Sequence, residues 1–219
     1  MFKFRRYIKS DEAIWDKFVS ESNNGTIFHL RKFLNYHPKD RFIDHSLLIS
    51  KNKKLFSVFP AAERVASDQN FLVSHPGSTV GSFVTPENLS IADSIELVNQ
   101  IIVYAKKSDF EGVQITLPPN LYQKRLSNYM DFAFFKKGFV YKKRDITSIL
   151  FLEKSIETTI KKFRPSHRRA VKTAHSKGII VSESEKYDEY YKILQKNLSK
   201  RHGVNPTHTL IELKKLNNF

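Results

Sequence analysis

The hydrophobic pattern of this chain changes many times between the two-residue repeat of β-strands and the 3.6-residue repeat of α-helices. Strand-like and helix-like segments are therefore mixed along the chain. Segments 45–50 and 55–59 flank the polar run 51–54, which predicts a β-hairpin. Intermixed strands and helices with a hairpin among them predict an α/β fold of the α+β, mixed-sheet kind.

Glycine, serine and proline residues mark the expected ends of the predicted elements. Gly25 is predicted to be the C-cap of the first helix, Ser90 and Ser155 are predicted N-caps, and Pro165 interrupts one helix. The predicted strands are 2–8, 45–50, 55–59, 71–74, 113–117, 139–152 and 179–182. The predicted helices are 10–22, 26–34, 90–107, 121–130, 155–177, 187–201 and 210–216.

The composition excludes several kinds of site. The chain has no cysteine, so disulfides, thiolate metal sites and cysteine nucleophiles are excluded, and a reducing compartment fits. The N-terminal run 1–12 is charged and lacks the apolar stretch of a signal peptide. No apolar run approaches the ~20 residues of a membrane span. We therefore expect a cytoplasmic protein without a transmembrane segment.

The formal net charge is +15, from 37 lysine and arginine residues against 22 acidic ones. Such a charge favours anionic partners, namely nucleic acid, nucleotide cofactors, anionic lipid or phosphorylated precursors. The alternative, which carries equal weight, is a generally basic surface without a particular partner.

The cations are most concentrated in segment 158–182, which contains no acidic residue. On the predicted helix, Arg168, Arg169 and Lys172 fall within about one turn. Together with Arg164 they form the candidate site for a phosphate-bearing substrate or a tRNA. The alternative is an ordinary amphipathic helix whose cations are solvated and whose small apolar residues pack.

The eight histidines do not predict a metal site, because no two of them stand at helical ligand spacing with a nearby carboxylate. His75 lies in a Ser-His-Pro-Gly turn and is the candidate for a polar, substrate-binding cleft residue. The alternative for any of these histidines is a packed or surface side chain. The spacing of residues identifies no catalytic base or nucleophile.

Four groups of segments form a recognisable order. The most specific is the basic helix Arg164–Ala174, which is followed by Gly178 and a predicted strand. The groups are 15–19 with 24–29, 59–62 with 74–78, 163–174 with 178–179, and 190–198 with 200–203 and 206–208. Together they resemble the FemAB-like branch of the GNAT acyltransferase superfamily over nearly the whole chain.

The resemblance implies two GNAT-like domains with the substrate in a cleft between them. Residues 1–150 would form the first domain, and 151–219 the N-terminal part of an incomplete second domain. The GNAT phosphate-binding run, Arg or Gln followed by two residues and Gly-x-Gly or Gly-x-Ala, does not occur. The nearest glycine pair, Gly77 and Gly81, is expected to form a turn between strands. We therefore expect the donor site to be incomplete and the chain to be a truncated form.

The resemblance further implies N- or O-acyl or aminoacyl transfer to a cell-envelope or polysaccharide precursor. The donor would be acetyl-CoA, another acyl-CoA or an aminoacyl-tRNA, without a metal. Arg201 and Lys32 match positions that contact the anionic substrate in the family. The alternatives are that Arg201 complements the helix dipole and that Lys32 is a surface lysine.

Two other functions compete with this one. A net charge of +15 is also typical of a nucleic-acid-binding module without catalytic activity, whose binding would depend steeply on salt. A third hypothesis is a catalytically inactive chain that keeps only the substrate-side half of the cleft. Hydrophobic surface on an incomplete second domain would favour homo-oligomers.

Overall fold

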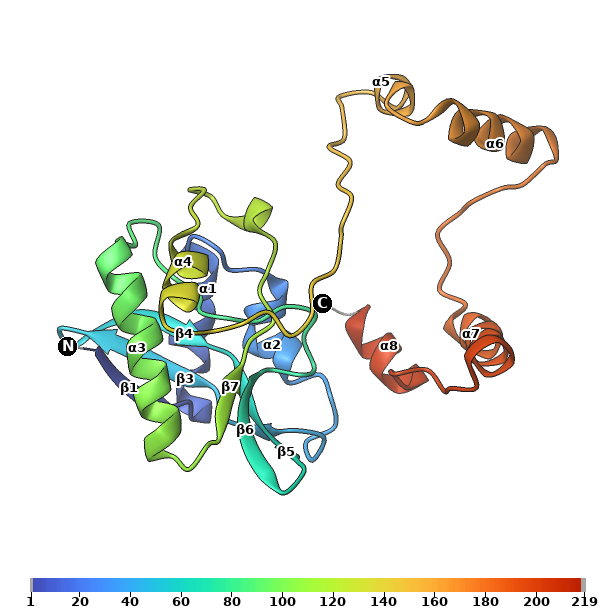
Figure 1. Ribbon diagram of the computed structural model, residues 1–219. Coiled ribbons are helices and arrows are strands. Elements are labelled where there is room, and N and C mark those ends of the chain that lie inside the picture. Colours follow the sequence, from blue (N-terminus) through green and yellow to red (C-terminus); the bar gives the residue numbers. More distant parts are fainter. Residues whose placement is uncertain (1, 218–219) are drawn as a thin grey trace. The chain divides into compact units, whose positions relative to one another are not determined.

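The computed structural model describes residues 2–217, whose helices and strands Figure 1 draws, and the chain divides into two units. Residues 2–140 together with 211–217 form unit 1, and residues 141–210 form unit 2. All strands of the described chain belong to unit 1, which is therefore the β-scaffold of the protein. The predicted domain boundary at residue 150 stays a prediction.

Two sheets build unit 1. The first has the order β1-β3-β4 and is antiparallel, and the second has the order β2-β5-β6-β7 with a parallel β6–β7 pair. The strands are β1 (Phe2–Arg6), β2 (Ile43–Asp44), β3 (Leu47–Lys51), β4 (Lys54–Phe59), β5 (Ala61–Ala66), β6 (Gln69–Ser74) and β7 (Gly112–Gln114). The predicted α/β fold with a mixed sheet is confirmed.

Two hairpins with two-residue turns fix the strand registers. Asn52 and Lys53 connect β3 to β4, and Ser67 and Asp68 connect β5 to β6; all four have φ between 51° and 65°. Left-handed backbone at both turn positions is the type I′ pattern, whose twist matches the paired strands. The first hairpin was predicted. The second was not, because the sequence of β5, AAERVA, does not alternate between apolar and polar residues.

Two helices begin at the serine N-caps that the sequence predicts. The Ser90 hydroxyl accepts from the Asp93 amide at 3.0 Å, and the Ser155 hydroxyl accepts from the Thr158 amide at 3.2 Å, so both predicted N-caps are confirmed. The helices are α1 (Glu12–Glu21), α2 (Arg31–Leu34), α3 (Ile91–Lys107), α4 (Tyr129–Lys136), α5 (Ile156–Lys161), α6 (Pro165–Ser176), α7 (Tyr187–His202) and α8 (Leu210–Leu216). Three short 3₁₀ helices are η1 (Lys9–Asp11), η2 (Ile27–His29) and η3 (Asn120–Tyr122). None of the helices within residues 2–217 is both long and apolar enough to cross a membrane.

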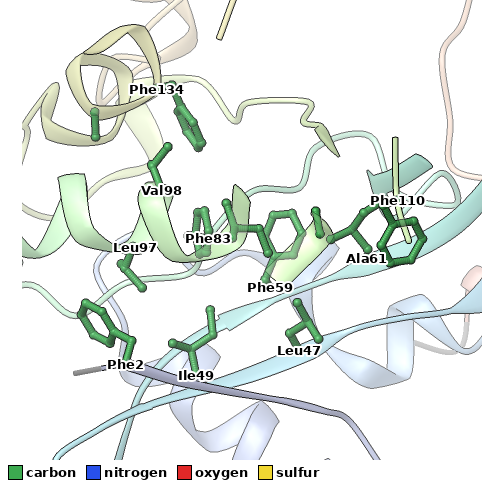
Figure 2. Packing of buried hydrophobic residues seen from close by; sticks show 14 of the residues in the cluster. Phe2, Leu47, Ile49, Phe59, Ala61, Phe83, Leu97, Val98, Phe110 and Phe134 are labelled. Atoms are coloured by element: carbon green, nitrogen blue, oxygen red, sulfur yellow. The ribbon is translucent and has the colours of Figure 1, made fainter. Parts of the chain in front are cut away.

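Helices cover both faces of the β3–β4 pair. Side chains of Leu47, Ile49 and Phe59 join α3 and α4 in one buried cluster, which Figure 2 shows. Leu48 and Val58 point to the opposite face and join α1 in a second cluster. This alternation is the two-residue period of a strand buried on both faces. Each buried Leu, Ile, Val or Phe contributes about 1.5–3 kcal/mol to folding.

The predicted helix 121–130 is wrong. This segment begins in η3 and continues as a loop, and α4 begins only at Tyr129. The loop's amides have other partners: the Lys124 amide donates to the Asn23 carbonyl at 2.9 Å, and the Arg125 amide to the Asn23 side chain at 2.7 Å. Contacts with a residue about a hundred positions earlier thus replace the helical hydrogen bonds.

The predicted strands 139–152 and 179–182 are also wrong. Both segments are described, and neither contains a strand residue. Both segments are rich in the β-branched and aromatic residues that strands favour, but no strand within residues 2–217 pairs with them. Strand propensity alone is therefore not sufficient to make a sheet.

Unit 2 has almost no interior of its own. Among residues 141–210, only Thr159 is buried. Its helices end where glycines adopt left-handed backbone, at Gly178 (φ 70°) and Gly203 (φ 65°), as the sequence predicts. Local signals therefore define α6 and α7, whereas packing defines the helices of unit 1.

The predicted C-cap role of Gly25 is wrong, because Ser22 is the C-cap of α1. The Ser22 hydroxyl donates to the Val19 carbonyl at 2.7 Å and accepts from the Gly25 amide at 2.9 Å. A Cβ at position 25 would overlap the Val19 carbonyl oxygen. Glycine is required here for close approach to the helix end, not for a left-handed backbone.

We predict that Gly25→Ala lowers the free energy of unfolding of unit 1 by about 2–3 kcal/mol, because the added methyl group has to displace backbone. The matched control is Gly112→Ala, whose Cβ would meet only the Phe71 side chain at 3.3 Å. Urea denaturation followed by the fluorescence of the single tryptophan, buried Trp15, measures both. Equal losses in the two variants would contradict the prediction.

Candidate functional site

A buried arginine organises the polar part of unit 1. Arg31 at the start of α2 is 2% exposed. Its guanidinium donates to the Asp44 carboxylate, to the Ser46 hydroxyl at 3.0 Å and to the Asn35 side chain at 3.0 Å, and it lies 3.8 Å above the Tyr7 ring. Although burial alone would raise the pKa of Asp44, the Arg31 charge holds that pKa below its ordinary value. The paired charge fixes α2 against the bend between β2 and β3.

His75, a predicted substrate-binding residue, lies next to this group and is 4% exposed. Its Nδ1 accepts from the Gly77 amide at 3.2 Å, and its ring meets that of Phe42 edge-on at 5.1 Å. Burial, opposed by the Asp44 charge and assisted by Arg31, lowers the pKa of His75 to about 4. The ring is therefore neutral and internal at pH 7, and a role in substrate binding stays a prediction.

Two further buried histidines each connect two neighbouring groups. His45 lies between the Glu63 carboxylate (Nδ1–Oε1, 2.8 Å) and the Tyr104 hydroxyl (Nε2–Oη, 2.7 Å). His29 lies between the Thr26 hydroxyl (2.9 Å) and the Gly81 carbonyl (3.2 Å). Burial lowers the pKa of both rings. In each case the neighbouring groups are satisfied by a neutral imidazole, so these residues connect elements of the fold.

A small polar pocket opens in unit 1 at a strained residue. Ser82 is buried with φ 82°, a conformation that a non-glycine residue adopts only when its surroundings enforce it. Asn24 provides that support, because its amide donates to the Phe83 carbonyl at 2.8 Å and accepts from the Thr85 amide at 2.9 Å. The pocket encloses about 30 Å³, room for one or two small groups.

The lining of this pocket is mixed. It combines hydrogen-bonding side chains, including the half-buried carboxylate of Asp131, with the apolar side chains of Phe83 and Met130. Polar groups on an apolar floor are typical of sites for small organic ligands. The sequence did not point to this pocket, because the run Asn23–Gly25 indicates only a helix end and Ser82 belongs to no motif.

The predicted cationic site lies in unit 2. Arg168, Arg169 and Lys172 line one open hollow with Pro165, and Arg164 is the residue that precedes α6. All four line or flank a single helix, so the hollow is an exposed surface. Arg201 lies in the last turn of α7 and is exposed. Lys32 is exposed on α2 in unit 1.

The structure thus brings three of the seven predicted site residues together on α6. Lys32 and His75 belong to unit 1. Lys32 is exposed, whereas His75 is buried. Their roles in binding stay predictions, as do those of Arg164 and Arg201.

Comparisons with known proteins identify the fold. No model of a known protein family matches the chain, and no curated protein matches it. Among solved structures, FemX matches with a TM-score of 0.62 and 14% identity over 99% of this chain. The fold is that of FemX. The predicted FemAB-like GNAT fold is therefore confirmed, and the chain spans 54% of FemX.

Two other solved structures match less closely. A GNAT family acetyltransferase from Staphylococcus aureus has a TM-score of 0.42 and 10% identity, covering 68% of this chain and 98% of its own. An aminoglycoside N-acetyltransferase, AAC(6')-Iy, solved with CoA, has a TM-score of 0.39 and 15% identity, covering 71% and 96%.

We predict that the free energy of unfolding of unit 1 falls as pH is lowered from 7 to 5. His29, His45 and His75 have lowered pKa values in the native state, so below the unfolded pKa of about 6.5 the unfolded chain binds more protons. The stability that these three histidines contribute is therefore fully present above the unfolded pKa. It is lost as the pH falls toward their native pKa values.

The variant His75→Asn keeps an acceptor for the Gly77 amide but cannot titrate. Between about pH 4.5 and 6 its pH slope is expected to be shallower by up to ~1.4 kcal/mol per pH unit. Exposed His175→Asn in unit 2 is the matched control and leaves the slope unchanged. The prediction fails if both variants retain the slope of the wild type in urea titrations.

Proposed function

We propose that this chain acts in acyl transfer, as an acyltransferase that moves an acyl or aminoacyl group onto an amine or hydroxyl of an anionic cell-envelope or polysaccharide precursor in the cytoplasm. The observation that carries the proposal is the FemX fold over 99% of the chain. A fold by itself does not define a reaction, so the proposal also depends on two surfaces of the molecule.

The first surface is the cationic face of α6. Arg168, Arg169 and Lys172 present three charges on one side of a helix that contains no acidic residue. In this proposal they hold phosphate groups of the acyl donor or of the precursor. Acyl-CoA and aminoacyl-tRNA both carry several phosphates, and exposed cations bind such groups with a strong dependence on salt.

The second surface is the polar pocket at Ser82. In this proposal it holds a small hydrogen-bonding group of the acceptor, with Asp131 as an acceptor of its N–H or O–H. Acyl transfer requires the nucleophile to lose a proton, and a carboxylate in the pocket is suited to receive it. The strained backbone at Ser82 is consistent with a site whose geometry is enforced by its surroundings.

The direct test is acyl transfer with acetyl-CoA or with aminoacyl-tRNA as donor and a nucleotide-linked sugar precursor as acceptor, read out as a mass increase of the acceptor. Arg168→Gln, Arg169→Gln and Lys172→Gln combined are expected to lower kcat/KM about tenfold or more, since several phosphate contacts are lost. The matched control is Lys192→Gln, Lys196→Gln and Lys200→Gln, which removes the same charge from exposed positions of α7.

The outcomes separate the competing functions. Transfer that responds to the α6 variant and not to the α7 variant supports the proposal. Salt-sensitive binding of RNA without transfer from either donor would instead support a nucleic-acid-binding module. Binding of the precursor without transfer would identify a chain that keeps only the substrate side of the cleft.

We also propose that the chain associates with itself through unit 2. Four apolar side chains of its extended segments are almost fully exposed: Ile146 (101%), Leu152 (80%), Ile180 (87%) and Val181 (93%). Exposed apolar segments of this kind mark interaction surfaces.

Ile180→Lys with Val181→Lys is therefore expected to weaken self-association in sedimentation velocity. Ser182→Lys with Ser184→Lys, at neighbouring exposed positions, adds the same charge and is expected to leave the apolar contact intact. A chain that stays monomeric at the highest attainable concentration would contradict the proposal.

A further inference from the structure

A compact cationic pocket lies in unit 1 on the loop that follows α2. His37 and Arg41 supply its charged and polar groups, and the rings of Tyr36 and Phe42 flank it. The carboxylate of Glu212, from α8, occupies it. The Glu212 Oε1 atom lies 2.9 Å from His37 Nδ1 and 2.6 Å from Arg41 Nη1.

The Glu212 carboxylate is almost completely shielded from water in this pocket. Glu212 is 2% exposed, and an isolated carboxylate taken out of water costs several kcal/mol unless it is paired. Both partners approach the same oxygen, and charge-assisted hydrogen bonds of this length are the strong ones. The contacts with His37 and Arg41 therefore replace the hydrogen bonds that the Glu212 carboxylate would make to water.

Both ring nitrogens of His37 have partners in this group. Its Nε2 faces the Gly77 carbonyl at 2.9 Å, and its Nδ1 faces the Glu212 carboxylate at 2.9 Å. The Arg41 Nη1 atom lies 3.4 Å from the same Nδ1. His37, Arg41 and Glu212 therefore form one connected group.

The other members of the pocket come from the loop after α2 and from the turn at Gly77. The His37 ring lies against Tyr36, with centroids 3.9 Å apart and the two planes tilted by 34°, and it meets Phe42 edge-on at 5.1 Å. A Cβ at Gly77 would overlap the His37 ring and come within 2.8 Å of Phe42, so the turn at Gly77 closes against both rings. Glu212, by contrast, is 171 residues away from Arg41 in the sequence.

We propose that His37 and Arg41 form a carboxylate-binding site of unit 1, in which Glu212 is an internal ligand that a carboxylate of the acceptor substrate replaces. The identification of the acceptor as the exchanging ligand rests on the function proposed above. The site itself does not, because it follows from the contacts of Glu212.

The group that His37 and Arg41 bind in this structure is a carboxylate, that of Glu212, so a carboxylate is the anion that we expect to replace it. Arg41 is able to recognise either a carboxylate or a phosphate, so the experiment has an arm for each.

The test is chemical rescue of Glu212→Ala in the full chain. Removal of the side chain takes away the carboxylate that His37 and Arg41 contact, and acetate carries the same group. Acetate is expected to raise the melting temperature of this variant, followed by Trp15 fluorescence, and to do so saturably. At ten times its Kd, acetate raises the folding equilibrium constant about tenfold. Sodium chloride at equal ionic strength is the control for salt, and inorganic phosphate is expected to act more weakly.

Three variants define the interpretation. The wild type and Glu212→Gln, in which the pocket is filled, are expected to show no specific shift with acetate. Glu212→Ala combined with Arg41→Gln is expected to lose the rescue. Glu185→Ala removes an exposed carboxylate of unit 2 and controls for the loss of one negative charge.

Saturation-transfer NMR from the protein to the acetate methyl group gives a second readout that does not depend on melting. Transfer in Glu212→Ala and not in the wild type supports the site. The proposal is overturned if acetate acts no differently from chloride on Glu212→Ala, or acts equally on the wild type, or still acts without Arg41. None of these readouts requires acyl transfer, so failure of the site and failure of the proposed function are distinguishable.

Discussion

A guanidinium that is shielded from water has to find partners for most of its N–H groups, and in unit 1 this requirement connects distant parts of the chain. Arg31 reaches Asp44 and Ser46 beside the bend between the two sheets. Ser46 in turn accepts from the amide of Ala61, the first residue of β5, at 3.3 Å. Loss of one member of such a group leaves an unpaired buried charge, which costs about 3–5 kcal/mol. Arg31 and its partners therefore connect helix α2, the bend between β2 and β3, and the first residue of β5.

The two units show different sources of stability. Unit 1 has helices on both faces of the β3–β4 pair and two buried clusters, so its elements depend on tertiary packing. Unit 2 has only Thr159 buried, and its helices depend on a serine cap and on glycines that end them. Chain entropy opposes a segment with so little burial. Substrates or partner surfaces that cover unit 2 would consequently stabilise it more than they stabilise unit 1.

The sequence predicts elements well where the signal is local. Helix α3 follows from a cap at Ser90 and an apolar stripe, and the β3–β4 hairpin follows from alternation around a polar turn. The prediction fails where distant residues take over the hydrogen bonds, as Asn23 does for the loop before α4. The same division applies to the sites. The cations of α6 are adjacent in sequence and were found, whereas Asn24 and Thr85 are 61 residues apart, and His37 and Glu212 are 175 apart.

The support that Asn24 gives to the Ser82 pocket also affects the chemical ageing of the protein. Asn24 precedes Gly25, and in a flexible chain the amide nitrogen after such an asparagine attacks the side chain and releases ammonia. Here the Gly25 amide is held by the Ser22 hydroxyl at 2.9 Å, and the Asn24 side chain is held by Phe83 and Thr85. The folded state thus keeps the two reacting groups engaged elsewhere. Once deamidation has occurred in an unfolded molecule, the resulting carboxylate would face the Phe83 carbonyl with no proton to donate, and refolding would rebuild the pocket with two acceptors in opposition.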